Sequence, residues 1–135
     1  MDKLEKLLNM LMDFNDDIRF AAVSNDKGEI LWWSQREGLK NLVPFEETKQ
    51  TLLRALHAWD ENARVKDFIG NGLYSISSYQ KIKRITVPLG SGKMLFCTLS
   101  NKPLKKSLIS GKKSYGHLAD MGKILSIVDF IKSQK

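Results

Sequence analysis

Apolar positions change their spacing along the chain in a regular order, and this order predicts alternating helices and strands. Leucine and phenylalanine recur at helical spacing from Leu4 to Phe14, so a first amphipathic helix is expected over residues 2–14. Residues 18–24 and 30–35 are short apolar runs on either side of the turn sequence NDKGE, which predicts a β-hairpin. Both runs are apolar at nearly every position, so we expect both strands to be central in a sheet covered by helices.

The second half of the chain shows the same change from helical to strand spacing. A loop over residues 36–47 leads into a helix whose apolar stripe runs from Leu52 to Ala63. This helix is expected to end near Lys66 or just before Gly70, because the sequence GNG that follows does not favour a helix. The remaining expected elements are strands over 73–79, 84–89 and 93–100, a loop over 101–117 and a helix over about 117–133.

These elements predict an α+β domain with the order α-β-β-α-β-β-β-α. Five strands would form an antiparallel sheet with the helices packed on it. The 135 residues fit one domain, residues 1–135, because no internal repeat, low-complexity segment or long linker divides them.

Three further features of the sequence indicate the cellular compartment in which the protein is expected. No apolar run approaches the roughly 20 residues that a membrane-spanning helix needs. Acidic residues interrupt the N-terminal segment, so we do not expect it to act as a signal peptide. Cys97 is the one cysteine, which excludes an intrachain disulfide. We therefore expect a cytoplasmic protein.

The net charge of +7 is unevenly distributed. Residues 1–67 carry 10 Lys/Arg and 13 Asp/Glu, whereas residues 68–135 carry 12 Lys/Arg and two Asp. The loop over 101–117 contains a basic segment with one aromatic residue: Lys102, Lys105, Lys106, Lys112, Lys113 and Tyr115. Such a segment can contact nucleic acid, an acidic protein or a membrane surface, and it can equally be a solvated loop.

No motif in the sequence points to catalysis, a metal or a cofactor. The run Gly90-Ser91-Gly92-Lys93 resembles a phosphate-binding loop, but Val87 stands where the motif needs glycine and Met94 where it needs Ser or Thr. A strand follows it rather than a helix, so we interpret it as a hairpin turn. Cys97, His57 and His117 have no partners at metal-ligand or nucleophile–base spacing.

Trp32 and Trp33 are adjacent in a predicted strand, so their side chains should point to opposite faces of the sheet. If helices cover only one face within the chain, the other tryptophan is exposed or meets a partner. The pair is therefore a candidate for self-association, although both faces can also be covered within one chain.

The stretch from Ile18 to Ser100 resembles the roadblock, longin and profilin group of small domains, and the roadblock arrangement most closely. The opening strand and turn FAAVSNDKGEIL carries this likeness, and the strand pair TVPLGSGKMLF is similar to small proteins of ammonia-oxidising archaea. The resemblance implies a domain without enzymatic activity that dimerises and acts as a scaffold or regulator for small GTPases or motor complexes. PAS-type and GAF-type sensors share a five-stranded sheet, but they carry several helices where one is expected here.

The sequence thus favours a homodimeric protein-interaction module that is not an enzyme. Its expected partners are a second copy and another protein, such as a small GTPase. The contact elements expected for dimerisation are the second helix or the second strand, and the basic segment is the expected face for the other partner. Two alternatives remain: nucleic-acid binding through the basic C-terminal half, and a small-molecule sensor with a pocket between sheet and helix.

Overall fold

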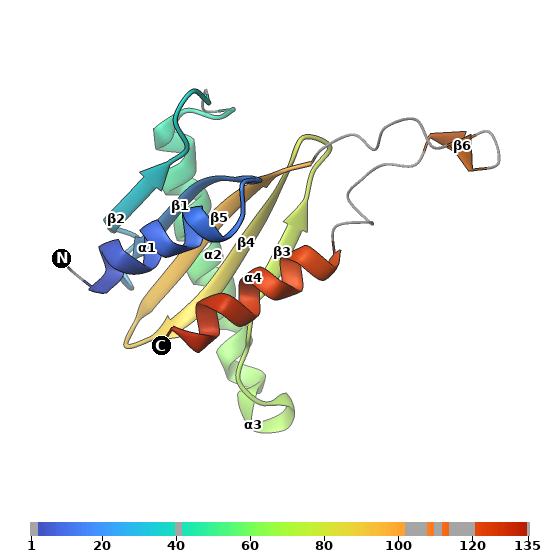
Figure 1. The fold of residues 1–135 in the computed structure, drawn as a ribbon. Coiled ribbons are helices and arrows are strands. Elements are labelled where there is room, and N and C mark those ends of the chain that lie inside the picture. The colour runs from blue at the N-terminus through green and yellow to red at the C-terminus, as the bar shows by residue number, and fades with distance from the viewer. Residues whose placement is uncertain (1–2, 40–41, 102–107, 110–111, 114–120, 135) are drawn as a thin grey trace.

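The computed structural model describes residues 3–39, 42–101, 108–109, 112–113 and 121–134. Its elements follow the expected order (Figure 1). They are α1 (Lys3–Phe14), β1 (Ile18–Ser24), β2 (Ile30–Gln35), α2 (Phe45–Asn62), the 3-10 helix η1 (Ala63–Val65), α3 (Lys66–Ile69), β3 (Ser75–Ser78), β4 (Ile82–Gly90), β5 (Lys93–Ser100), β6 (Leu108–Ile109), β7 (Lys112–Lys113) and α4 (Met121–Ser133). The prediction of an α+β fold is confirmed.

The five long strands form one antiparallel sheet in the order β2-β1-β5-β4-β3. Strands β3, β4 and β5 are neighbours in sequence and in the sheet, and β5 then lies beside β1. The first hairpin is thereby joined to the rest of the sheet through β1. Strand β5 is central, which agrees with its nearly continuous burial.

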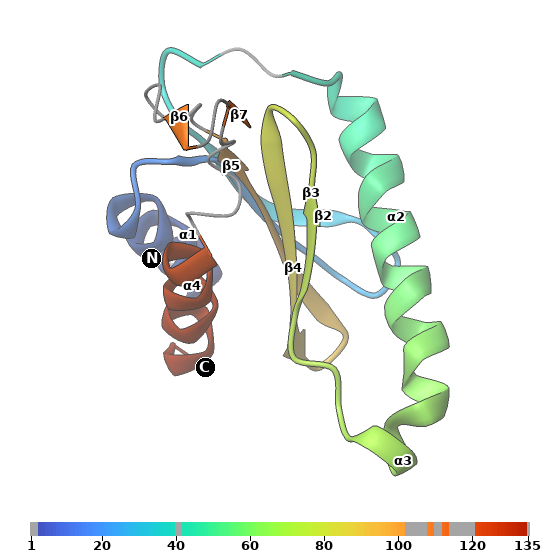
Figure 2. The same cartoon turned by 90° about the vertical axis from the view of Figure 1, so that its right-hand side faces the viewer.

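Helices cover both faces of the sheet (Figure 2): α1 and α4 lie on one face and α2 on the other. The larger core lies under α1 and α4, where Leu11 and Ile127 meet Val23, Ile85 and Leu95 of the sheet. Alternate strand positions face the helices, so the period of two in the sequence places every second side chain in this core.

A smaller core lies between the sheet and α2. It contains Phe20, Ala22, Met94 and Phe96 from the strands, and Leu52 is the buried side chain of α2. The half-buried Trp59 also packs here and donates a hydrogen bond from Nε1 to Thr86 Oγ1 over 3.1 Å. The core on this face is therefore the smaller of the two.

One expectation about the strands is wrong. β2 is an edge strand rather than a central one, since within the described residues it pairs only with β1, and its side chains remain partly exposed. The loop expected over 101–117 contains a short antiparallel pair, β6 and β7, in which Lys113 pairs with Leu108 and Lys112 with Ile109. The expected start of the last helix, near His117, lies outside the described residues.

Candidate protein-interaction surface

Trp32 and Trp33 lie on opposite faces of the edge strand β2, as expected. Trp32 pairs with Val23, which belongs to the core under α1 and α4, whereas Trp33 pairs with Ala22 from the core under α2. Both remain partly exposed, Trp32 by 36% and Trp33 by 55%. The fold therefore leaves part of each indole in contact with solvent.

Trp33 is held in an aromatic cluster and not simply left in solvent. Its ring centroid lies 6.2 Å from that of Phe20 and 6.0 Å from that of Phe45 at the start of α2. An open groove of about 500 Å³ runs between the first hairpin and α2, and its apolar lining includes Ile30, Trp33 and Leu53. A fixed, half-exposed aromatic side chain in a groove is typical of a protein-binding surface.

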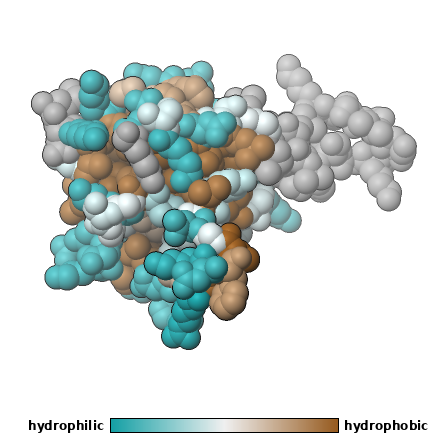
Figure 3. Space-filling view, turned by 90° about the horizontal axis from the view of Figure 1, so that it is seen from below, coloured by the Kyte–Doolittle hydropathy of each residue, from teal (hydrophilic) through white to brown (hydrophobic). Residues whose placement is uncertain are grey.

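A second apolar surface lies where the chain leaves α2. Here η1, α3 and the segment before β3 extend beyond the sheet (Figure 1). We call its apolar residues the α3 patch: Val65, Phe68, Ile69, Leu73 and Tyr74. Phe68 is 86% exposed and Ile69 is 80% exposed, so neither contributes to a core of this chain. Figure 3 views the molecule from this end and shows brown, apolar side chains exposed among hydrophilic ones.

The α3 patch continues directly into the open edge of the sheet. β3 pairs with β4 on one side, and within the described part of the chain no strand pairs with its other side. Its sequence SISS carries neither lysine nor proline, the residues that natural edge strands use against pairing. An unblocked edge next to exposed aromatic and aliphatic side chains is suited to pairing with another chain.

The Gly90-Ser91-Gly92-Lys93 run is a hairpin turn between β4 and β5, which confirms the interpretation from sequence. Gly90, Ser91 and Gly92 have φ values of 84°, 55° and 73°. These left-handed conformations explain the two glycines. Lys93 begins a strand and no helix follows the turn, so the run lacks the helix N-terminus that holds phosphate in such loops.

The basic segment falls mostly outside the described residues. Lys102, Lys105, Lys106 and Tyr115 are not described, and Lys112 and Lys113 form the short strand β7. The role expected for this segment stays a prediction.

The remaining sequence candidates acquire no chemical role from the structure. Cys97 is fully buried in β5, and burial raises the pKa of its thiol to about 12, so the thiol stays protonated at neutral pH. Among the described residues, no three His, Cys, Asp or Glu side chains lie together as a metal site would require. No helix in the described ranges is both long and apolar enough to cross a membrane.

Sequence reasoning missed the α3 patch. Phe68 and Ile69 fall at the expected end of the second helix, directly before the helix-breaking sequence that starts at Gly70. The signal that could have identified an exposed surface is a pair of large apolar residues next to a helix-breaking glycine. At that point the helix has passed the last turn that can pack on the sheet.

The fold places the chain among small α+β domains in which a five-stranded antiparallel sheet lies between a pair of helices, here α1 and α4, and a single helix, here α2. Solved structures of roadblock proteins share this arrangement, so the chain has a roadblock-like fold. The gliding protein MglB of Thermus thermophilus superimposes with a TM-score of 0.62 at 10% identity, over 98% of this chain and 87% of that one. Myxococcus xanthus MglB gives 0.59 at 12% identity, over 98% and 94%. A Roadblock/LC7 domain from Streptomyces avermitilis gives 0.58 at 9% identity, over 98% and 97%.

No family model matches the sequence, and no curated protein matches it. The likeness to known proteins therefore lies in the fold. The expected similarity to archaeal proteins is not tested by these matches and stays a prediction.

Proposed function

We propose that this chain is a homodimeric, non-enzymatic protein-interaction module that acts in the cytoplasm, with a small GTPase as its partner. One observation carries the proposal: an exposed apolar patch adjoins an open, unblocked sheet edge. The roadblock-like fold supports it, because roadblock domains commonly dimerise and regulate small GTPases.

The two copies would meet through β3 and the α3 patch. Pairing of one β3 with the other would satisfy the backbone groups at the open edge. The same approach would bury Phe68 and Ile69, which are otherwise exposed by 86% and 80%. Burial of a large apolar side chain contributes about 1.5–3 kcal/mol, so two such residues on each copy are a substantial driving force. The second helix was expected from the sequence as a dimer contact. In this proposal the contact is made by η1 and α3, which follow its C-terminal end.

The dimer interface is tested by replacing Phe68 with aspartate. We expect the wild-type chain, 15.4 kDa as a monomer, to run as a dimer in size-exclusion chromatography with light scattering. Phe68→Asp should raise the dimer dissociation constant by about 100-fold or more, because it places a charge in a desolvated contact.

Leu125→Asp is the matched control, since Leu125 is 42% exposed on α4, which lies on the opposite face of the sheet. It should leave the dimer intact. A wild-type monomer at high concentration, or a folded Phe68→Asp dimer of unchanged affinity, would show that the proposed interface is wrong. Dimer loss in Trp33→Lys instead would place the interface on β2.

Two contacts are proposed for the second partner: the basic segment, and the exposed indole of Trp33 in its groove beside α2. The five lysines would attract an acidic surface, and the tryptophan would supply apolar contact. Affinity capture from the native host, after nuclease treatment, should recover a small GTPase with the wild-type chain. Replacing Lys102, Lys105, Lys106, Lys112 and Lys113 by glutamine should reduce that recovery about tenfold or more and make it less sensitive to salt.

Equal recovery by both chains would contradict a role for the lysines. Recovery of nucleic acid before nuclease treatment, with no bound protein afterwards, would support the nucleic-acid alternative instead.

A further inference from the structure

The course of α2 across the sheet determines which strand positions on its face are covered. The helix begins beside β2, where the Phe45 ring centroid lies 6.0 Å from that of Trp33. It reaches β4 near its C-terminal end, where Trp59 donates its hydrogen bond to Thr86. The helix therefore crosses the sheet diagonally, and the end of β3 and the start of β4 lie away from its path.

Exposure along β3 and β4 shows that this corner of the α2 face is uncovered. Arg84 lies two residues before Thr86 and so shares its face, and Ser77 pairs with Arg84 and is exposed. Tyr79, which follows β3, is 53% exposed. Ile76 points to the other face and packs, partly buried, against the core under α1 and α4. The described part of the chain thus leaves a bare area beside the open edge of the sheet.

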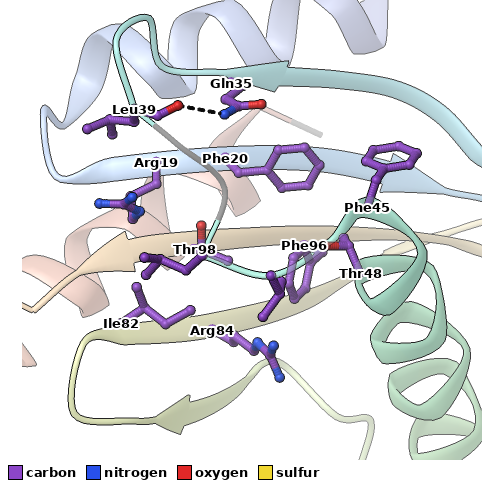
Figure 4. Close-up of a pocket in the computed structure, with 12 residues that line it drawn as sticks. Arg19, Phe20, Gln35, Leu39, Phe45, Thr48, Ile82, Arg84, Phe96 and Thr98 are labelled. Atoms are coloured by element: carbon purple, nitrogen blue, oxygen red, sulfur yellow. Dashed lines mark hydrogen bonds between the residues drawn. The ribbon is translucent and has the colours of Figure 1, made fainter.

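Arg84 lies in this area together with Tyr79. Its side chain points away from Thr98 (Figure 4), and its central guanidinium carbon lies 5.0 Å from the centroid of the Tyr79 ring. Nη1 makes a long contact of 3.4 Å to the Tyr79 hydroxyl, and Nε is buried with no hydrogen-bond acceptor among the described residues. A buried cationic donor without an acceptor is costly, so an acid supplied from outside the chain would be favourable here.

The dimer proposed above, on which this inference rests, determines what reaches this area. When two copies of an edge strand pair antiparallel about a two-fold axis, the start of each strand lies beside the end of the other. The start of β3 is preceded by α3, and its end is followed by Tyr79. Within one chain, α3 lies at the opposite end of the sheet from the turn between β3 and β4 (Figure 1). Edge pairing therefore carries the α3 of one copy toward Tyr79 and Arg84 of the other.

The helix α3 offers both an aromatic and an acidic side chain. Phe68 is 86% exposed. Asp67 precedes it, is exposed, and forms no ion pair with the described residues. Glu61, at the end of α2, already lies 3.7 Å from Arg64. Asp67 is therefore an acid next to the apolar contact whose charge is not engaged within its own chain.

We propose that Tyr79 and Arg84 of each copy form a docking site for α3 of the other copy. Phe68 of the second copy packs on the Tyr79 ring, and the carboxylate of its Asp67 accepts hydrogen bonds from the Arg84 guanidinium. Aromatic rings attract one another in such pairs, and the planar guanidinium fork matches a carboxylate. The two-fold axis makes the contact twice, so each copy both offers an α3 and receives one.

The test exchanges the two charges on separate chains, Arg84→Glu on one and Asp67→Arg on the other. Each variant alone brings like charges together in both contacts, so its dimer dissociation constant should rise by about tenfold or more. A dimer formed from one chain of each variant again joins opposite charges in both contacts. Native mass spectrometry of an equimolar mixture should therefore show heterodimers well above the half that random exchange gives. A contact within one chain would produce no such preference.

The matched control is the pair Lys6→Glu and Asp13→Arg, which exchanges the same charges at exposed positions of α1 on the opposite face of the sheet (Figure 2). This mixture should exchange at random. Random exchange of the Arg84 and Asp67 variants, or equal enrichment in the control, would overturn the docking site.

These outcomes are distinct from failure of the dimer interface, which Phe68→Asp tests by itself. A dimer that Phe68→Asp weakens and the charge exchange does not affect keeps that interface and overturns the docking site. A wild-type monomer overturns both. If Arg84→Glu does not fold, Asp67→Arg alone decides, because Asp67 is exposed and an unchanged dimer affinity would overturn the docking site.

Discussion

Replacing Phe96 by alanine is expected to lower the free energy of unfolding by about 3–5 kcal/mol, the usual cost of deleting a buried aromatic ring. Phe96 is 2% exposed and lies on the central strand β5, paired with Ala22 on one side and Thr86 on the other. Its ring meets that of Phe20 edge-on at a centroid distance of 6.3 Å. Because the core under α2 is small, few neighbouring side chains can move to fill the space.

The effect is measured by urea denaturation at one protein concentration for all variants, since a dimer's stability depends on concentration. Phe14→Ala is the matched control. Phe14 is 44% exposed and stacks on Phe130 at 4.5 Å, so its loss should cost about 1 kcal/mol. Phe96→Leu should fall between the two. If Phe96→Ala costs no more than Phe14→Ala, the core under α2 does not contribute as described.

The helices and most strands could be predicted because their apolar spacing is a local property. The stripe from Leu4 to Phe14 predicts α1, and the alternation around β4 and β5 predicts a hairpin whose turn needs glycine. The place of a strand in the sheet is not local. The residues of β2 are apolar on both faces whether a helix or a partner covers them, so the sequence pattern could not distinguish a central strand from an edge strand.

A cavity of about 40 Å³ lies on the α2 face of the sheet (Figure 4), and it could not be predicted from the sequence for a related reason. Phe20, Arg84 and Thr98 are far apart in the sequence and become neighbours only through the register of three strands. In the sequence, Arg84 is simply the polar member of an alternating strand, which is typical of a solvent-facing position. The cavity lies between this face of the sheet, the first turn of α2 and the side chains of Leu39, Leu42 and Val43, and that arrangement depends on the tertiary fold.

The contacts of Arg36 lead to the second large effect on stability. This side chain, just beyond β2, joins three elements of the fold. Its Nη2 donates hydrogen bonds to the backbone carbonyls of Met12, over 2.8 Å, and Asn15, over 3.0 Å. Its Nε donates to the carbonyl of Ile18 over 2.8 Å. The guanidinium therefore binds carbonyl groups at the C-terminal end of α1, where a positive charge is favourable, and at the first residue of β1.

Arg36→Met should lower the free energy of unfolding by about 2–4 kcal/mol, because it removes three charge-assisted hydrogen bonds and leaves their carbonyl acceptors partly desolvated. Methionine keeps most of the apolar stem, so the loss reports on the guanidinium. Arg64→Met, at an exposed arginine whose Nη1 lies 3.7 Å from Glu61, should change stability by no more than about 0.5 kcal/mol. Hydrogen exchange should locate the damage, with amides in α1 and at the start of β1 losing protection before those of β4 and β5. Uniform loss of protection, or equal effects of the two substitutions, would show that Arg36 does not hold α1 against the sheet.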